Sequence, residues 1–316
     1  LVLATAGLGS EVLLASALVF VAFPRVSRGW AGMANMPGAA VAGFSDVVSI
    51  GEFGARIEAN PTIVLRVEFP DGTPPDVNAL YWRGRSFDRF DGRRWTHSYQ
   101  MPPSRAPADW YRERWPGPMM RQRIFATALD SRVMFALHPV LRVDTDTRAQ
   151  PVFDNAGDLL YFTVAAPAYT AWSMVGKPDP DALRAAPEEG GFTPRGNRYL
   201  QVPRLPARIA ALADSLTRGA TTRYDKAKAI ESWLRTFTYT LELPATAREA
   251  TLDHFLFERR AGHCEYFSTA MVVMMRTLGI QAREVNGFRG GEGSELGDYL
   301  RSEEHTSELQ SRLHLV

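Results

Sequence analysis

The sequence predicts an α+β protein in which an apolar N-terminal segment is followed by a strand-rich region and then by a helical region. Three patterns lead to this prediction. Apolar side chains fill most of the first 24 residues, alternate with polar ones in parts of the region 61–178, and recur at helical spacing between residues 200 and 300. The 316-residue chain is 45% hydrophobic and 22% charged, which is typical of a globular protein rather than a disordered one.

The apolar segment at residues 1–24 is expected to be the remnant of a transmembrane helix. A helix needs roughly 20 apolar residues to span a membrane, and this stretch just reaches that length with Glu11 as its only charge. The chain begins at Leu1 rather than at methionine, so we expect the helix to start further upstream. A buried core helix is the alternative. Residues 25–60 are rich in glycine, alanine and serine and are expected to be a linker.

Residues 61–178 are expected to form a β-rich domain, built as an antiparallel sandwich or barrel. Apolar and polar side chains alternate from Ile63 to Phe69, which is the period of a half-buried strand. Asp91-Gly92 is a hairpin signal. Arginines and aspartates are interleaved between residues 83 and 94, which favours a mixed solvated face. The aromatic side chains nearby are expected in the core rather than on a binding face: Tyr81, Trp82, Phe87, Phe90 and Trp95.

Residues 200–300 are expected to form a partial domain with three helices. One follows Pro206 and ends near Gly219, and a second runs from Asp225 to Arg235. The third has apolar residues at helical spacing, and Gly279 fits the left-handed position just past its end. The recurring apolar residues of this third helix are Phe267, Met271, Met274 and Leu278.

Cys264 is expected at the start of the third helix, after a tight turn at Gly262. Backbone N–H groups and the helix dipole favour negative charge at that end. A helix N-terminus lowers the pKa of a thiol and so favours the thiolate, which is the nucleophilic form. The position therefore suits a reactive cysteine, and a buried structural cysteine is the alternative.

Composition limits the partners and cofactors. The formal net charge is +1, which gives no electrostatic argument for a nucleic-acid partner. A single cysteine excludes a disulfide within the chain. Cysteine and histidine are too few and too scattered for a zinc site. We therefore expect no nucleic acid, no metal and no cofactor.

Residues 262–288, which begin Gly-His-Cys-Glu-Tyr-Phe-Ser, resemble the core of the transglutaminase-like superfamily. Residues 80–84, 90–95 and 253–258 resemble a bacterial subgroup in which transmembrane helices precede an extracytoplasmic transglutaminase domain. The resemblance covers most of residues 12–300. It implies a protein of the bacterial inner membrane whose soluble domain lies outside the cytoplasm.

The resemblance implies a papain-like Cys-His-Asp triad, in that chain order, with Cys264 as the nucleophile. The family's cysteine attacks a glutamine side-chain amide and expels ammonia, and a lysine amine or water then resolves the thioester. The implied activity is acyl transfer of the protein-glutamine gamma-glutamyltransferase type on a protein or peptide substrate. A cysteine peptidase or amidase acting on cell-wall peptides is one alternative, and a non-catalytic binding module is the other.

The family's histidine and aspartate lie on strands downstream of the block that ends at Phe288, and neither strand is present. We therefore expect this fragment to be inactive and its full-length parent to be the enzyme. His263 is the alternative base, although a neighbour on the same turn usually points elsewhere. Glu265 is expected to be exposed in the first helical turn, and Arg283 to hold the following strand. Three further histidines are expected at ordinary polar or core positions: His97, His138 and His254.

Residues 301–316 differ in character from the chain before them. The run from Arg301 to Ser311 matches the translation of a common sequencing-adapter oligonucleotide. We therefore expect residues 301–316 to be an assembly artefact, so that His305 and His314 are not members of a triad. A genuine amphipathic helix is the alternative, and a continuous genomic coding sequence through residue 316 would favour it.

Overall fold

The chain divides into two compact units, residues 1–39 and residues 40–316, and every residue that the structure describes belongs to the second. The predicted transmembrane helix at residues 1–24 lies outside the described residues. No helix among the described residues is long and apolar enough to cross a membrane. The computed structural model describes residues 47–50, 63–72, 76–77, 80–98, 117–126, 132–146, 148, 150–161, 168–176, 179–186, 197–242, 244–246, 248–290, 292–293, 299–303 and 314–315.

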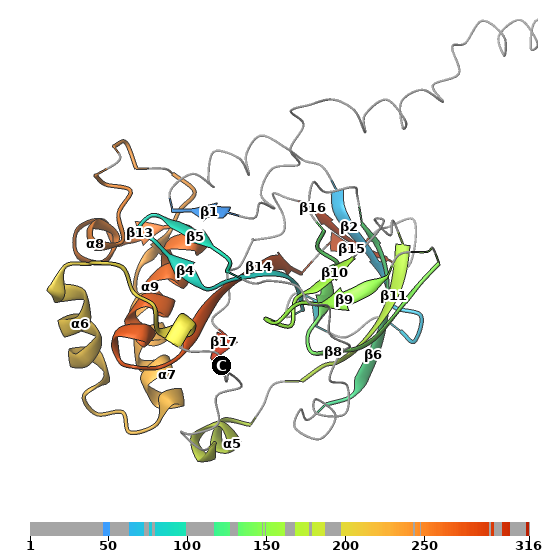
Figure 1. Cartoon of the computed structure of the whole chain (residues 1–316), viewed down its shortest axis with the longest axis horizontal. Helices are drawn as coiled ribbons and strands as arrows, with labels where there is room; N and C mark the ends of the chain where they lie inside the picture. The colour runs from blue at the N-terminus through green and yellow to red at the C-terminus, as the bar shows by residue number, and fades with distance from the viewer. Residues whose placement is uncertain are drawn as a thin grey trace, which may run out of the picture. The chain divides into compact units, whose positions relative to one another are not determined.

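The largest sheet is antiparallel and has the strand order β15-β16-β2-β6-β11-β8 (Figure 1). The predicted alternation is confirmed in β2, where Leu65 and Val67 are buried and Arg66 is exposed. β2 also pairs with β16. The last three residues of β16, 301–303, belong to the segment that the sequence predicts to be an assembly artefact. The strands are β2 Ile63–Glu68, β6 Met119–Ala126, β8 Val140–Thr145, β11 Ala168–Met174, β15 Glu292–Gly293 and β16 Tyr299–Glu303.

A second sheet, with the order β17-β14-β3-β7, joins the two regions that the sequence separates at residues 178–200. Its strands are β3 Tyr81–Phe87, β7 Ala136–Leu137, β14 Ala282–Arg289 and β17 His314–Leu315. β14 runs antiparallel to β3, with Glu284 opposite Phe87 and Phe288 opposite Trp82. The β-rich region therefore supplies the strand next to β14, and the helical region does not form a sheet of its own there.

Smaller sheets complete the strand content. β1 Val47–Ser49, β5 Arg94–Thr96 and β4 Arg89–Phe90 form one sheet, so a strand lies within the predicted linker. The predicted hairpin at Asp91-Gly92 is confirmed, because it joins β4 to β5 and Gly92 has a φ of 109°. The other pairs are β9 Pro151–Phe153 with β10 Leu159–Tyr161, and β12 Thr238–Tyr239 with β13 Ala261–Gly262.

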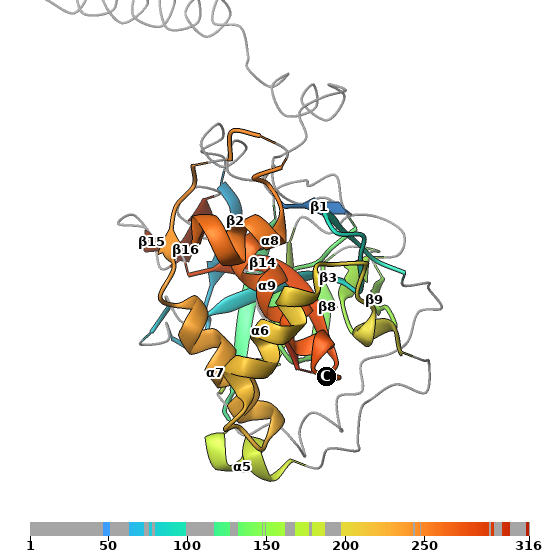
Figure 2. The same ribbon diagram turned by 90° about the vertical axis from the view of Figure 1, so that its left-hand side faces the viewer.

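Helix α9 packs against α6, α7, α8 and β14 (Figure 2). Helix α7 begins as expected near Asp225, because the side chain of Thr222 caps it by accepting a hydrogen bond from the Asp225 N–H. The mixed helix and strand content agrees with the predicted α+β class. The helices are α5 Pro180–Ala185, η3 Asn197–Leu200, α6 Ala207–Thr217, α7 Arg223–Leu234, α8 Leu252–His254, the π-helical turn η4 Phe255–Arg259, and α9 Cys264–Thr277.

Apolar side chains gather in two cores. The first lies between the two larger sheets and contains Trp82 and Phe288, and the second surrounds α9. Of the five aromatic residues predicted to lie in the core, Trp82, Phe87, Phe90 and Trp95 are buried, which confirms the prediction for them, and Tyr81 is only partly buried. The predicted solvated face is wrong for part of its range. Arg83, Arg85 and Asp88 are all buried instead. β3 is paired along both edges, by β14 and β7, and Asp158 and Asp154 contact Arg83 and Arg85.

Candidate active site

Helix α9 begins at Cys264, as the sequence predicts. The short strand β13 leads into it, and parallel pairing with β12 fixes the path of the chain, with Thr240 N–H donating to the Gly262 carbonyl at 3.0 Å. His263 is the N-cap residue and has an extended backbone. The Cys264 residue is 7% exposed. The thiol thus sits on the first turn of a helix, where the helix dipole favours an anion.

Gly262 has a different role from the predicted one. It is extended within β13, and the left-handed turn falls two residues earlier, at Arg260 with a φ of 48°. A Cβ atom at Gly262 would lie 3.0 Å from the Tyr266 ring and 3.2 Å from the Phe255 ring. Glycine therefore allows β13 to pack closely against two aromatic rings here, and it does not form a tight turn.

His263 is fully buried next to the nucleophile candidate. Its ring lies edge-on to Tyr266 with centroids 5.1 Å apart, and its Nδ1 atom is 3.8 Å from Oε2 of Glu265. Burial, helped by the nearby charge of Arg259, lowers the pKa of His263 to about 4. The imidazole is therefore neutral at pH 7. Its role as an alternative base stays a prediction.

Polar groups at the start of α9 and on the neighbouring strand β14 are buried, which the sequence did not predict. Glu265 is 5% exposed, so the expectation of an exposed carboxylate is wrong. Ser268 Oγ lies 3.0 Å from the Cys264 carbonyl oxygen and donates to Oε1 of the fully buried Glu284 at 2.7 Å. The apolar residues that flank these polar groups predict a buried helix face and a buried strand. A polar residue at such a position is the signal that could have identified these groups.

The far end of α9 is held by one arginine. Arg276 donates from Nε to the Ala282 carbonyl at 2.8 Å, and from Nη1 to the Asp88 and Gln201 carbonyls at 2.9 and 2.7 Å. These bonds tie the helix to β14 and to the segment after β3. Gly279 then has a φ of 76°, which confirms the predicted left-handed position after the helix.

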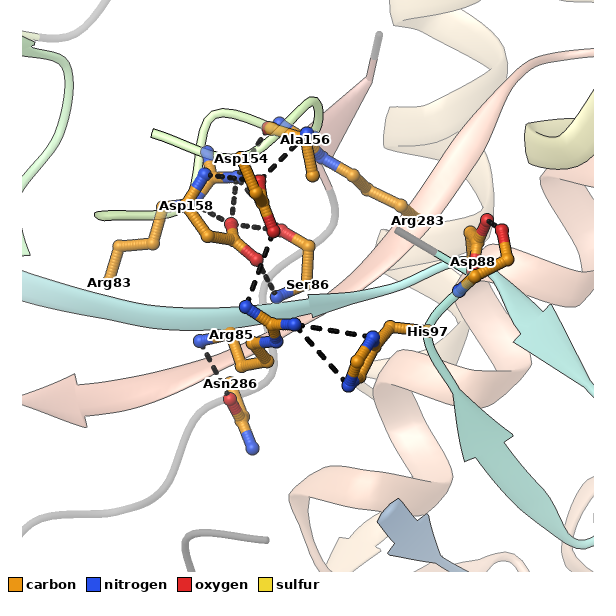
Figure 3. A network of polar contacts seen from close by, with 11 residues as sticks. Arg83, Arg85, Ser86, Asp88, His97, Asp154, Ala156, Asp158, Arg283 and Asn286 are labelled. Carbon is orange, nitrogen blue, oxygen red and sulfur yellow. Dashed lines mark hydrogen bonds and ion pairs between the residues drawn. The ribbon is translucent and has the colours of Figure 1, made fainter. Parts of the chain in front are cut away.

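A buried ionic network holds β3 and β14 (Figure 3). Asp158, in the turn between β9 and β10, accepts hydrogen bonds from Arg83 Nη2 at 2.7 Å and from the N–H and Oγ of Ser86 at 2.6 and 2.7 Å. Arg85 pairs with Asp154 of the same turn at 3.3 Å. Arg283 donates to the Ala156 carbonyl at 2.6 Å, which agrees with the expectation that Arg283 holds the strand after the helix.

The two aspartates of this turn titrate differently. Burial, the largest single influence, opposes ionisation of Asp158, but Arg83, Arg283 and the Ser86 hydrogen bonds together hold its pKa below the usual value. Burial and the charge of Asp158 raise the pKa of Asp154. Of the two aspartates in the network, Asp158 is therefore the one that ionises more readily.

Three further histidines contact charged side chains. His138 Nε2 is 3.3 Å from Arg83 Nη1, and His97 Nδ1 is 3.2 Å from Arg85 Nη2. His254 lies 3.4 Å from Glu258. Their expected status as ordinary polar positions agrees with these contacts.

Comparison with known families identifies the class. The chain matches the TgpA N-terminal domain over residues 1–180 and the transglutaminase-like superfamily over residues 210–308. It therefore belongs to the family of proteins that join a TgpA N-terminal domain to a transglutaminase-like core, as the resemblance in the sequence suggests.

Two proteins and one crystal structure are similar to this chain. The chain is 32% identical over 297 residues to a protein-glutamine gamma-glutamyltransferase of Pseudomonas aeruginosa, covering 90% of this chain and 40% of that protein. It is 41% identical over 121 residues to the uncharacterised protein YebA of Bacillus subtilis, covering 37% of this chain and 16% of YebA. The crystal structure of the periplasmic domain of TgpA from Pseudomonas aeruginosa is similar, with a TM-score of 0.69 and 27% identity over 87% of this chain and 93% of that one. The chain thus spans less than half the length of the curated relatives that it matches.

Proposed function

We propose that this chain is part of a protein-glutamine gamma-glutamyltransferase in which Cys264 is the nucleophile. The observation that carries the proposal is the placement of the chain's one cysteine at the first residue of α9, inside the stretch that matches the transglutaminase-like core. A relative from Pseudomonas aeruginosa, 32% identical over 297 residues, carries this activity in its name.

The chemistry proceeds in two steps. The Cys264 thiolate attacks the side-chain carbonyl carbon of a glutamine residue, the C–N bond breaks, and ammonia leaves with a proton supplied by a general acid. The resulting thioester is then attacked by a lysine amine to give an isopeptide, or by water to give glutamate. Either attack restores the thiol. The start of α9 favours the anionic form of the nucleophile in the first step.

The general base and its orienting carboxylate are proposed to come from chain beyond residue 300. A nucleophile of this type needs a base within hydrogen-bond reach and a third group that orients the base. We therefore propose that residues 1–316 alone are inactive and that the full-length protein is the enzyme.

The proposed location is outside the cytoplasm of a bacterium, with residues 1–24 as a membrane anchor. The similar crystal structure is that of the periplasmic domain of TgpA from Pseudomonas aeruginosa. A domain in this compartment would meet protein or peptide substrates outside the cytoplasm, which suits the proposed partners.

An assay of the full-length protein tests the function. A glutamine-containing peptide and a fluorescent primary amine are supplied, and ammonia release, amine incorporation and peptide cleavage are followed together. We expect both ammonia and labelled peptide, with ammonia in excess by the share of thioester that water resolves. Both should be lost in Cys264→Ala and retained in Thr277→Ala at the other end of α9. Cleaved peptide without ammonia would replace the proposal with a cysteine peptidase. If residues 1–316 were as active as the full-length protein, the proposal that the general base lies downstream would be wrong.

A further inference from the structure

Glu284 is a fully buried carboxylate beside the helix that begins at Cys264. It lies on β14 with no exposed surface, and its Oε1 atom accepts a hydrogen bond from Ser268 Oγ at 2.7 Å. A buried carboxylate is costly to keep, and its hydrogen bonds offset only part of that cost. An apolar residue would pack at this position more cheaply, so the carboxylate calls for a reason beyond packing.

Ser268 connects this carboxylate to the main chain of the nucleophile candidate. It lies one helical turn after Cys264, and its Oγ atom is 3.0 Å from the Cys264 carbonyl oxygen and 3.3 Å from that of Glu265. A hydroxyl has a single proton and rotates to suit its partners. The short contact with Glu284 therefore fixes where the hydroxyl lies, and the hydroxyl touches the first two peptide units of α9.

Glu284 can hold Ser268 only because β14 is itself held. Glu284 stands opposite Phe87 of β3, and the next residue, Val285, stands opposite Ser86. Ser86 is bonded to Asp158 through both its N–H and its Oγ, and Arg283 is bonded to the Ala156 carbonyl (Figure 3). The turn at residues 154–158 thus holds β14 directly at Arg283, and it holds the Ser86 position of β3 that stands opposite Val285.

We propose that Glu284 is a positioning residue for Cys264 and acts through Ser268 on the first turn of α9. This proposal rests on the proposed function. Attack on a side-chain amide requires close alignment of sulfur and carbon, and a displacement of about 1 Å can lower the rate about 100-fold. A turn that is bonded to a rigid strand keeps the thiol aligned, whereas a turn held by helix bonds alone frays more readily.

Three variants of the full-length protein separate positioning from packing. Glu284→Gln keeps an oxygen that accepts from Ser268, Glu284→Met removes it at similar length, and Ser268→Ala removes the donor. We expect kcat for ammonia release to stay within about threefold of the wild type in Glu284→Gln and to fall about tenfold in the other two, with KM changed less than about twofold. The double variant with Ser268→Ala and Glu284→Met should be no slower than either single variant, because both remove the same bond.

The controls separate this proposal from the proposed function and from loss of the fold. Ser215→Ala removes a similar serine bond, from Oγ to the Leu212 carbonyl at 2.9 Å, on the exposed face of α6 and should leave kcat unchanged. Ser268→Ala deletes one oxygen atom and keeps the test valid if Glu284→Met does not fold. If Cys264→Ala is inactive while Glu284→Met and Ser268→Ala keep full kcat, positioning is wrong and the proposed function stands. A fall in Glu284→Gln as large as in Glu284→Met would also overturn positioning by this bond. Full activity in Cys264→Ala would overturn the proposed function.

Discussion

Replacing Asp158 with alanine should destabilise the protein strongly, although Asp158 lies outside the helices. Its side chain is 0% exposed and that of its partner Arg83 is 6% exposed. The substitution removes the acceptor for two arginine N–H groups, at 3.2 and 2.7 Å, and for the N–H and Oγ of Ser86. Breaking a buried ion pair by removing one partner costs about 3–5 kcal/mol, because the remaining charge stays buried without its counter-charge. Domains are stable by about 5–15 kcal/mol, so the loss is a large share.

Urea denaturation followed by tryptophan fluorescence measures this loss. The matched control is Asp71→Ala, which removes an ion pair with Arg121 at 2.6 Å whose side chains are 65% and 38% exposed. A surface pair of this kind contributes about 0–1 kcal/mol. The free energy of unfolding should therefore fall several times further in Asp158→Ala than in Asp71→Ala. Equal losses in the two variants would refute the view that the network holds β3 and β14 together.

Three further predictions follow from the same contacts. Gly287→Ala should lower the free energy of unfolding by about 1–3 kcal/mol in thermal unfolding, because its Cβ would lie 2.1 Å from the Trp82 carbonyl oxygen; an unchanged melting temperature would contradict this close approach of β14 to β3. Trp95→Phe should cost about 1 kcal/mol in the same assay, because it removes the 2.9 Å bond from Nε1 to Thr269 Oγ1; no loss would mean that this bond contributes nothing. The folded-state pKa of Asp158 is lowered, so the stability that its charge contributes is present above the unfolded pKa of about 3.9 and is lost as the pH falls through the folded pKa. The difference in unfolding free energy between wild type and Asp158→Asn should therefore shrink from pH 6 to pH 3. A constant difference would argue against ionised Asp158.

Local features of the site could be predicted because they depend on a few neighbouring residues. The start of α9 at Cys264 and the left-handed Gly279 follow from apolar spacing and from the freedom of glycine. The hairpin at Asp91-Gly92 follows from turn chemistry, and the Asp91 carboxylate accepts from the N–H groups of Arg93 and Arg94.

Features that depend on distant pairing could not be predicted in the same way. β3 and β14 are about 200 residues apart in the chain, and the Arg85 N–H donates to the Asn286 side chain across a separation of 201 residues. Nothing in the local pattern around Arg83 or Arg85 shows that a turn at residues 154–158 covers them. Polar residues that local patterning assigns to a solvated face are therefore buried here as an ionic network.

The role of Gly262 shows the same limit on a smaller scale. A glycine two residues before a helix suggests a turn, but the rings that crowd Gly262 come from η4 and from the helix itself. Their positions depend on the packing of Phe255 against Tyr266, with centroids 5.2 Å apart. Sequence alone did not distinguish a turn glycine from a packing glycine.

Trapping of the acyl-enzyme tests the nucleophile most directly. The full-length protein is mixed with a glutamine-containing peptide, quenched in acid during turnover, digested and mapped by mass spectrometry. We predict that the fragment containing Cys264 gains the mass of the peptide minus one ammonia, and that the adduct is absent from Cys264→Ala. Turnover with Cys264 unmodified, or with the adduct on another residue, would contradict the account.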